Sequence, residues 1–133
     1  MKKLLTITAI IEAATGLGLL AAPAVLARLL LGGTLDTPAA LTVARVAGAA
    51  LLALGVACWL AASDTQSCAA RGVVSAMVLY NFGAMFVLGA AGLGPRPVGM
   101  ALWPAVVLHT AMTVWCLTSL FRKSANPFSG NPP

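Results

Sequence analysis

Four long apolar runs divide the chain, over residues 4–22, 39–62, 72–93 and 98–121. Short breaks rich in proline, glycine or charge separate them. Each run is near or above the roughly 20 residues that a helix needs to cross a hydrocarbon core. Because backbone groups in lipid must find their hydrogen bonds within the segment, we expect helices rather than strands. The pattern therefore predicts an all-α integral membrane four-helix bundle over residues 1–121.

The connection between the first two runs carries a shorter apolar pattern. Residues 24–31 follow Pro23 and precede Gly32 and Gly33. Proline suits the first turn of a helix, and glycine suits the position just past its end. This predicts a short helix, and we expect it to lie at the outer membrane interface with Arg28 toward the lipid headgroups.

The composition indicates which solvent surrounds these helices. Hydrophobic residues make up 60% of the chain and charged residues 8%, whereas about a quarter of a soluble domain is charged. Lipid is the solvent that tolerates such a surface. The net charge of +5 does not indicate a nucleic-acid binder, because the basic residues stand singly or in pairs at the ends of apolar runs.

The positions of Lys and Arg in the loops predict the orientation. With the N-terminus inside, the inner side holds five basic residues and the outer side two: Lys2, Lys3, Arg71, Arg122 and Lys123 against Arg28 and Arg96. By the positive-inside rule, both ends are predicted to face the cytoplasm. The membrane we expect is a bacterial cytoplasmic membrane. Residues 122–133 are rich in Asn, Ser, Pro and Gly and are predicted to form a flexible cytoplasmic tail. The first run also imitates a signal peptide, but its length and Glu12 favour retention as a helix.

Motifs for chemistry are absent from the sequence. The three cysteines, Cys58, Cys68 and Cys116, have neither CxxC nor Cys/His spacing, so we expect no disulfide framework and no metal site. The glycines lack nucleotide-binding spacing, and no Ser–His–Asp set is available. Met77, Tyr80, Phe82 and Met85 are interpreted as packing residues. The sequence predicts a protein that is not an enzyme and carries no cofactor.

One conspicuous polar residue stands inside each apolar run: Glu12, Arg45, Asn81 and His109. At 1.5 Å per residue, Glu12, Asn81 and His109 lie roughly 13, 15 and 19 Å from the cytoplasmic face. Arg45 lies nearer the outer face. A charge at the centre of a spanning helix costs about 3 kcal/mol, so such groups turn inward and pair. We predict a Glu12–Arg45 ion pair within an intramembrane polar cluster that Asn81 and His109 complete.

Small and polar residues flank these positions at helical spacing and predict which helix faces form the bundle interior. The stripes are Thr8, Glu12, Thr15, Gly16 and Leu19; then Thr42, Arg45, Gly48, Leu52 and Gly55; then Ala105, His109, Met112, Thr113 and Cys116. Two interpretations of the cluster stay open. It fixes the helix register, or it forms a proton- or ligand-responsive site in which Glu12 and His109 change protonation.

Several of these positions carry a family resemblance. With Glu12, Gly16, the short loop helix ending at Gly32-Gly33, and Arg45-x-x-Gly48, the chain resembles DoxX-like small bacterial four-helix membrane proteins over most of residues 4–121. The resemblance implies a four-helix fold and, for some members, association with quinone-linked redox enzymes as membrane subunits.

A second resemblance concerns the first helix alone. The context of Glu12 is similar to that of the essential glutamate in small multidrug resistance transporters. Arg45 opposite that glutamate would hold it ionised and oppose the exchange of a proton for a cationic drug.

Two functions follow as expectations. The first is a non-catalytic accessory or assembly subunit of a larger membrane complex, with a respiratory or other redox enzyme as the candidate. The alternative is a small proton-coupled transporter or quinone-contacting protein that uses Glu12, Arg45, Asn81 and His109. Expected partners are the lipid bilayer, other membrane subunits or further copies of the chain, and a quinone or lipid, but no nucleic acid.

Overall fold

The structure, a computed structural model, describes residues 1–124 and is helical throughout that range apart from its connections. The elements are α1 (Lys2–Ala21), α2 (Pro23–Leu31), α3 (Pro38–Ala61), α4 (Cys68–Gly92) and α5 (Leu102–Ser124). Helices α1, α3 and α4, and α5 as far as Phe121, are long and apolar enough to cross a membrane. The predicted four-helix bundle with a short additional helix is confirmed. Because α5 continues to Ser124, only residues 125–133 of the predicted tail fall outside the described residues.

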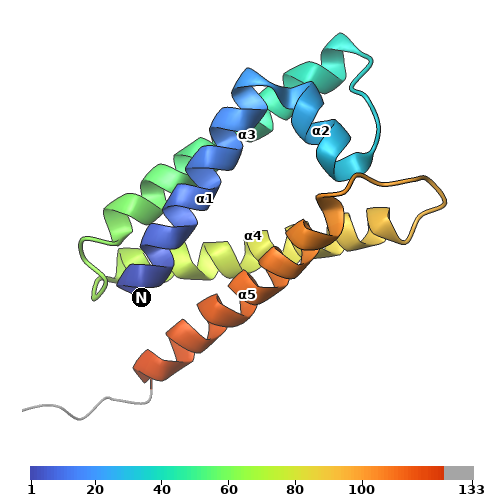
Figure 1. Cartoon of the computed structure of the whole chain (residues 1–133). Helices are drawn as coiled ribbons and strands as arrows, with labels where there is room; N and C mark the ends of the chain where they lie inside the picture. The colour runs from blue at the N-terminus through green and yellow to red at the C-terminus, as the bar shows by residue number, and fades with distance from the viewer. Residues whose placement is uncertain (125–133) are drawn as a thin grey trace, which may run out of the picture.

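The long helices associate as two pairs. Helix α1 packs along α3, and α4 packs along α5, while α3 and α4 touch over a much shorter stretch. Helix α2 lies between the two pairs and contacts α1, α3 and α5 (Figure 1). The bundle is therefore two helix pairs that α2 bridges at one end, which we call the α2 end.

The α1–α3 pair depends on a close backbone approach. A Cβ on Gly16 would lie 2.7 Å from the carbonyl oxygen of Gly48, and a Cβ on Gly48 would lie 2.8 Å from the carbonyl oxygen of Gly16. No larger residue fits between backbones at that distance. In lipid, where burying apolar surface gives little driving force between helices, such close van der Waals packing holds them together.

The hydrophobic core lies at the opposite end of the bundle, where α1 begins and α4 follows α3. It joins all four long helices through Leu4, Leu5, Ala9, Cys58, Ala62, Val74, Met77, Met112 and Cys116. We call this the core end. The two helix pairs are thus packed directly on each other at the core end and bridged by α2 at the α2 end.

The connection between α4 and α5 is tied to α2. The backbone N–H of Ala101 donates to the carbonyl of Leu29 (2.9 Å), and the N–H of Gly99 donates to that of Leu30 (3.1 Å). These bonds use carbonyls that the C-terminus of α2 cannot satisfy within its own helix. They also hold residues 98–101 outside α5. The expected start of the fourth spanning helix at residue 98 is therefore four residues too early, because apolar composition continues into this connection.

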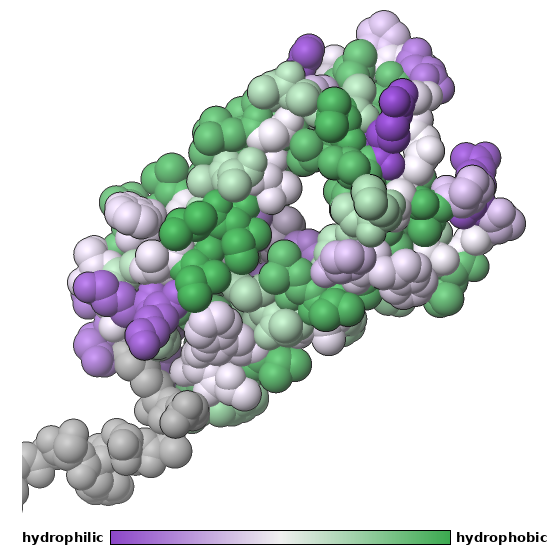
Figure 2. All heavy atoms as spheres, viewed as in Figure 1, coloured by the Kyte–Doolittle hydropathy of each residue, from purple (hydrophilic) through white to green (hydrophobic). Residues whose placement is uncertain are grey.

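The molecular surface suits a lipid environment. Large apolar side chains are exposed on each long helix, among them Ile10, Leu60, Phe86 and Val107. Figure 2 shows hydrophilic residues gathered toward the two ends of the molecule, with apolar surface between them. This distribution fits a protein whose middle contacts a bilayer and whose ends meet water.

Candidate ligand pocket between α1, α2, α4 and α5

Three of the four predicted polar residues come together. Glu12 is 4% exposed and Asn81 is 1% exposed, and His109 is half-buried. They project from α1, α4 and α5, at depths that the residue count from the helix ends already suggested. Arg45 is exposed on α3 and lies outside the group.

A direct hydrogen bond links α4 to α5. His109 Nδ1 lies 2.8 Å from Asn81 Oδ1, and Asn81 Nδ2 donates to the carbonyl oxygen of Met77, also at 2.8 Å. The Asn81 amide therefore makes one hydrogen bond through its NH2 group and one through its oxygen. Since the Asn81 side chain is bonded one turn back on its own helix, it holds the His109 ring in a fixed orientation.

Tyr80 connects this pair to Glu12. Its hydroxyl lies close enough to the Glu12 carboxyl group to interact with it, and its ring meets the His109 ring edge-on, with centroids 5.7 Å apart and planes at 82°. Edge-to-face contacts of this kind are favourable for aromatic rings. The polar side chains thus form one continuous chain across three helices: Glu12, Tyr80, His109 and Asn81.

The predicted Glu12–Arg45 ion pair is wrong. Among the described residues no ion pair joins these two side chains, and Arg45 is exposed whereas Glu12 is buried. Two features of α3 explain the error. Its buried face holds Gly48, Leu51 and Gly55, and Arg45 lies about 100° around the helix from the middle of that face.

The register of the helix pair separates the two charges further. Ala13, next to Glu12, packs on Gly55, whereas Arg45 stands ten residues earlier in α3, roughly 15 Å along its axis. Arg45 is therefore too far from Glu12 to stabilise a charge on its carboxyl group.

A pocket of about 240 Å³ opens beside the polar chain. Glu12, Thr15, Tyr80 and His109 form its polar wall. The other walls are mostly aliphatic, with Leu26, Leu29 and Leu30 from α2, Leu88 from α4 and Leu108 from α5. Figure 2 shows a hollow in this part of the molecule, between α1 and α2 on one side and α5 on the other. Apolar walls with a few convergent polar groups are typical of small-molecule sites.

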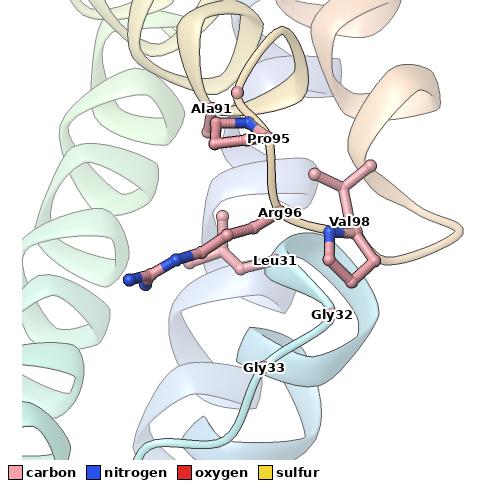
Figure 3. Close-up of a pocket in the computed structure, with 9 residues that line it drawn as sticks. Leu31, Gly32, Gly33, Ala91, Pro95, Arg96 and Val98 are labelled. Atoms are coloured by element: carbon pink, nitrogen blue, oxygen red, sulfur yellow. The ribbon is translucent and has the colours of Figure 1, made fainter.

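A larger pocket, of about 480 Å³, lies where the end of α2 meets the α4–α5 connection. Leu31, Gly32, Arg96 and Val98 are among its lining residues (Figure 3). Arg96 is the charged residue that lines it, and it is exposed. No buried polar side chain faces this space, so the smaller pocket is the better candidate for recognition.

Tyr80 is the functional residue that the sequence interpretation missed, because it was assigned to packing. The signal was present: Tyr80 is the chain's single tyrosine, and it directly precedes Asn81 in a spanning helix. A buried tyrosine hydroxyl usually finds a hydrogen-bond partner, and in lipid that partner must come from the protein. The carboxyl group of Glu12, at a similar depth on another helix, was the available choice.

The site can exchange hydrogen bonds with a ligand through a carboxyl, a phenol and an imidazole. Among the described residues no group of three or more His, Cys, Asp or Glu side chains is placed to hold a metal ion. Comparisons with family models, with curated proteins and with solved structures found no match. The resemblance to DoxX-like proteins stays a prediction from the residues quoted above.

Proposed function

We propose that the protein is a non-catalytic membrane protein that binds the ring of a quinone-type molecule drawn from the bilayer. One observation carries the proposal: Glu12, Tyr80 and His109 converge on a single pocket whose remaining walls are mainly aliphatic. A lipid-soluble molecule with a polar, hydrogen-bonding ring matches this combination of surfaces. A purely apolar lipid chain would leave the polar wall without partners, which is costly.

The size and position of the pocket support a ring-sized ligand. A protein cavity of roughly 150 Å³ holds benzene, and pockets for drug-sized ligands start at about 300 Å³. The 240 Å³ here suits one substituted ring rather than a whole lipid. Because the pocket lies among helices that could span a membrane, a hydrophobic tail on the ring could extend between them into lipid.

The test is photo-crosslinking of the protein in lipid nanodiscs with an azido-quinone that carries a decyl tail. We expect labelling of peptides from α1, α4 and α5 that an excess of the unlabelled decyl quinone and its quinol suppresses. Ala105→Phe should abolish this specific labelling, because Ala105 lines the pocket and the added ring fills it. Ala111→Phe makes the same change at an exposed position of the same helix and should label normally. Labelling that no competitor suppresses, or a labelling yield that Ala105→Phe leaves unchanged, would refute the proposal.

A second candidate, the accessory or assembly subunit, is favoured by Arg45. This arginine is exposed on a helix that could span a membrane, roughly 10 Å along α3 from Pro38. An exposed guanidinium at that depth needs an anionic partner, which a neighbouring subunit or a second copy of the chain can supply. If the protein belongs to the DoxX-like group, some of whose members are associated with quinone-linked redox enzymes as membrane subunits, the quinone-binding function and the subunit function would be compatible.

The subunit proposal is tested by native mass spectrometry after extraction in a mild detergent. We expect a larger complex of fixed stoichiometry that Arg45→Gln weakens. Arg28→Gln removes an exposed arginine from α2, outside the spanning helices, and should leave the complex intact. A monomer in every extraction would refute it. The proposed location is a bacterial cytoplasmic membrane with both termini inside, supported by the distribution of Lys and Arg.

A further inference from the structure

The hydrogen bonds of Asn81 determine which nitrogen of His109 carries the proton. Asn81 Nδ2 is 2.8 Å from the carbonyl oxygen of Met77, which can only accept. The amide oxygen therefore faces His109, and its distance to Nδ1 is 2.8 Å. Because an amide oxygen cannot donate, Nδ1 must be the donor. In the neutral ring, the proton sits on Nδ1.

The other ring nitrogen is then an acceptor. A neutral imidazole with a proton on Nδ1 has a lone pair on Nε2. Among the described residues, no buried side-chain nitrogen or oxygen lacks a hydrogen-bond partner, and His109 has no bonded partner at Nε2. Nε2 is therefore accessible, and His109 lines the pocket. A molecule in the pocket meets a hydrogen-bond acceptor at this position.

Glu12 and Thr15 also line the pocket. The Thr15 hydroxyl and a protonated Glu12 carboxyl can each act as donor or as acceptor. His109 Nε2 is therefore the position in the polar wall whose role as an acceptor is fixed by the hydrogen bonds of the fold.

We infer that the pocket selects the reduced, hydroxyl-bearing quinol over the quinone. A quinol hydroxyl donates to His109 Nε2. A quinone carries only acceptors and would set its carbonyl oxygen against this lone pair. A site built to receive a hydroxyl discriminates strongly against an analogue that lacks it. The inference concerns binding alone and rests on the function proposed above.

The protonation of His109 is open to direct measurement, because it is the single histidine of the chain. Protein labelled with nitrogen-15 at histidine, in nanodiscs at a pH where the ring is neutral, gives one pair of imidazole signals. We expect Nδ1 to carry the proton and Nε2 to have the shift of an unprotonated nitrogen. Asn81→Leu removes the acceptor at Nδ1 and should allow both tautomers. A proton on Nε2 in the wild-type protein would overturn the inference.

Ligand selection is measured by competition against the azido-quinone. The competitors are one decyl-tailed compound in three forms: quinol, kept reduced under anaerobic conditions, quinone, and the dimethyl ether of the quinol, which keeps the shape but has no donor. We expect the quinol to compete at a concentration about tenfold lower than the other two, because one buried hydrogen bond can contribute a difference in affinity of that size. His109→Phe should remove this preference while leaving the concentration at which the ether competes unchanged. Decanol, which offers a hydroxyl without a ring, should compete weakly.

The outcomes separate the inference from the proposed function. Equal competition by all three forms, or a decanol effect as strong as that of the quinol, would overturn quinol selection and leave ring binding in place. No competition by any form would refute the binding function itself. Glu12→Gln leaves the imidazole in place and should keep the tenfold preference; loss of the preference in this variant would overturn its assignment to His109.

Discussion

At the scale of single residues, the Asn81–His109 bond is the contact most open to measurement. We predict a coupling of about 0.6 kcal/mol between Asn81→Leu and His109→Leu in a double-mutant cycle, the average for polar contacts between helices in membranes. Each single change leaves one buried polar partner unpaired, and the double change removes both. The measurement is reversible unfolding in mixed micelles.

Thr110 and Val106 supply a control for that cycle. The Thr110 hydroxyl donates to the Val106 carbonyl within α5 and is exposed, so Thr110→Val should not couple to Asn81→Leu. Zero coupling between Asn81 and His109 would show that the hydrogen bond contributes no net stability, and the fixed orientation of the imidazole would lose its support.

Single residues also show where sequence interpretation succeeds and where it stops. Counting residues from the helix ends correctly put Glu12, Asn81 and His109 at similar depths, because the rise of a helix is constant. It could not find the partners. A helix rotation of about 100° and a register of ten residues exclude Arg45 from the cluster, and neither is encoded in the spacing within one helix. Tyr80 was missed for the same reason: its ring is apolar, and the spacing within one helix does not show which side chain on another helix its hydroxyl meets.

At the scale of helices, the α1–α3 crossing should be sensitive to one methyl group. Gly16→Ala would put a Cβ 2.7 Å from backbone atoms of Gly48 and Leu52, which cannot move without separating the helices. Alanine gains about 1 kcal/mol over glycine in a helix, but overpacking costs about 1–3 kcal/mol. We therefore expect net destabilisation in a thermal melt in detergent. Gly83→Ala, where a Cβ meets nothing within 4 Å, should be neutral or stabilising. A similar gain at both positions would contradict the close crossing.

A second prediction at this scale concerns the backbone hydrogen bonds that attach the α4–α5 connection to α2. A Cβ on Gly99 would overlap with the carbonyl of Leu29, so Gly99→Ala should detach the α4–α5 connection from α2. We expect hydrogen exchange at the Ala101 amide to rise at least tenfold, which corresponds to about 1.4 kcal/mol of lost local stability. The comparison is Gly33→Ala, just past α2, where a Cβ meets nothing within 4 Å. Unchanged protection at Ala101 would show that these backbone bonds do not hold the connection.

Helix existence was predictable from composition, but the starts of two helices were not: α4 begins at Cys68 rather than at residue 72, and α5 at Leu102 rather than at residue 98. Residues 98–101 are apolar enough to read as the start of a spanning helix, yet their backbone bonds go to α2. Pro23 and Gly32-Gly33 are different, since proline and glycine carry their own conformational preferences. These preferences predicted the short helix, and α2 occupies Pro23–Leu31 with Gly32 in the left-handed conformation at its end. Local chemistry predicts ends well where the backbone itself is constrained, and poorly where a distant segment provides the hydrogen bonds.

At the scale of the whole molecule, the pocket is a consequence of how the helices pair. Because α1 packs on α3 and α4 packs on α5, the space between the pairs is filled by side chains only at the core end. Toward the other end α2 spans the gap and leaves the 240 Å³ pocket beneath it. Four similar apolar runs can pair in several ways, and their sequences do not state which. The bundle was therefore predictable, whereas the pocket and the role of α2 in forming it were not.

The orientation of the molecule decides which side of the membrane the pocket lies nearer, and a native thiol can report it. Cys68, at the start of α4, is exposed, whereas Cys58 and Cys116 are buried. With the N-terminus in the cytoplasm, we expect a membrane-impermeant maleimide to label Cys68 in inverted vesicles and to spare it in intact cells. Cys68→Ser should abolish the labelling.

Gly33→Cys, made in the Cys68→Ser protein, moves the only exposed thiol of the described residues to the α2 end and should reverse the pattern. If Cys68 is labelled in intact cells instead, the distribution of Lys and Arg has misled the orientation. Because Leu26, Leu29 and Leu30 of α2 line the pocket, the pocket would then be nearer the cytoplasmic leaflet, and any partner that delivers or receives its ligand would have to reach it from that side.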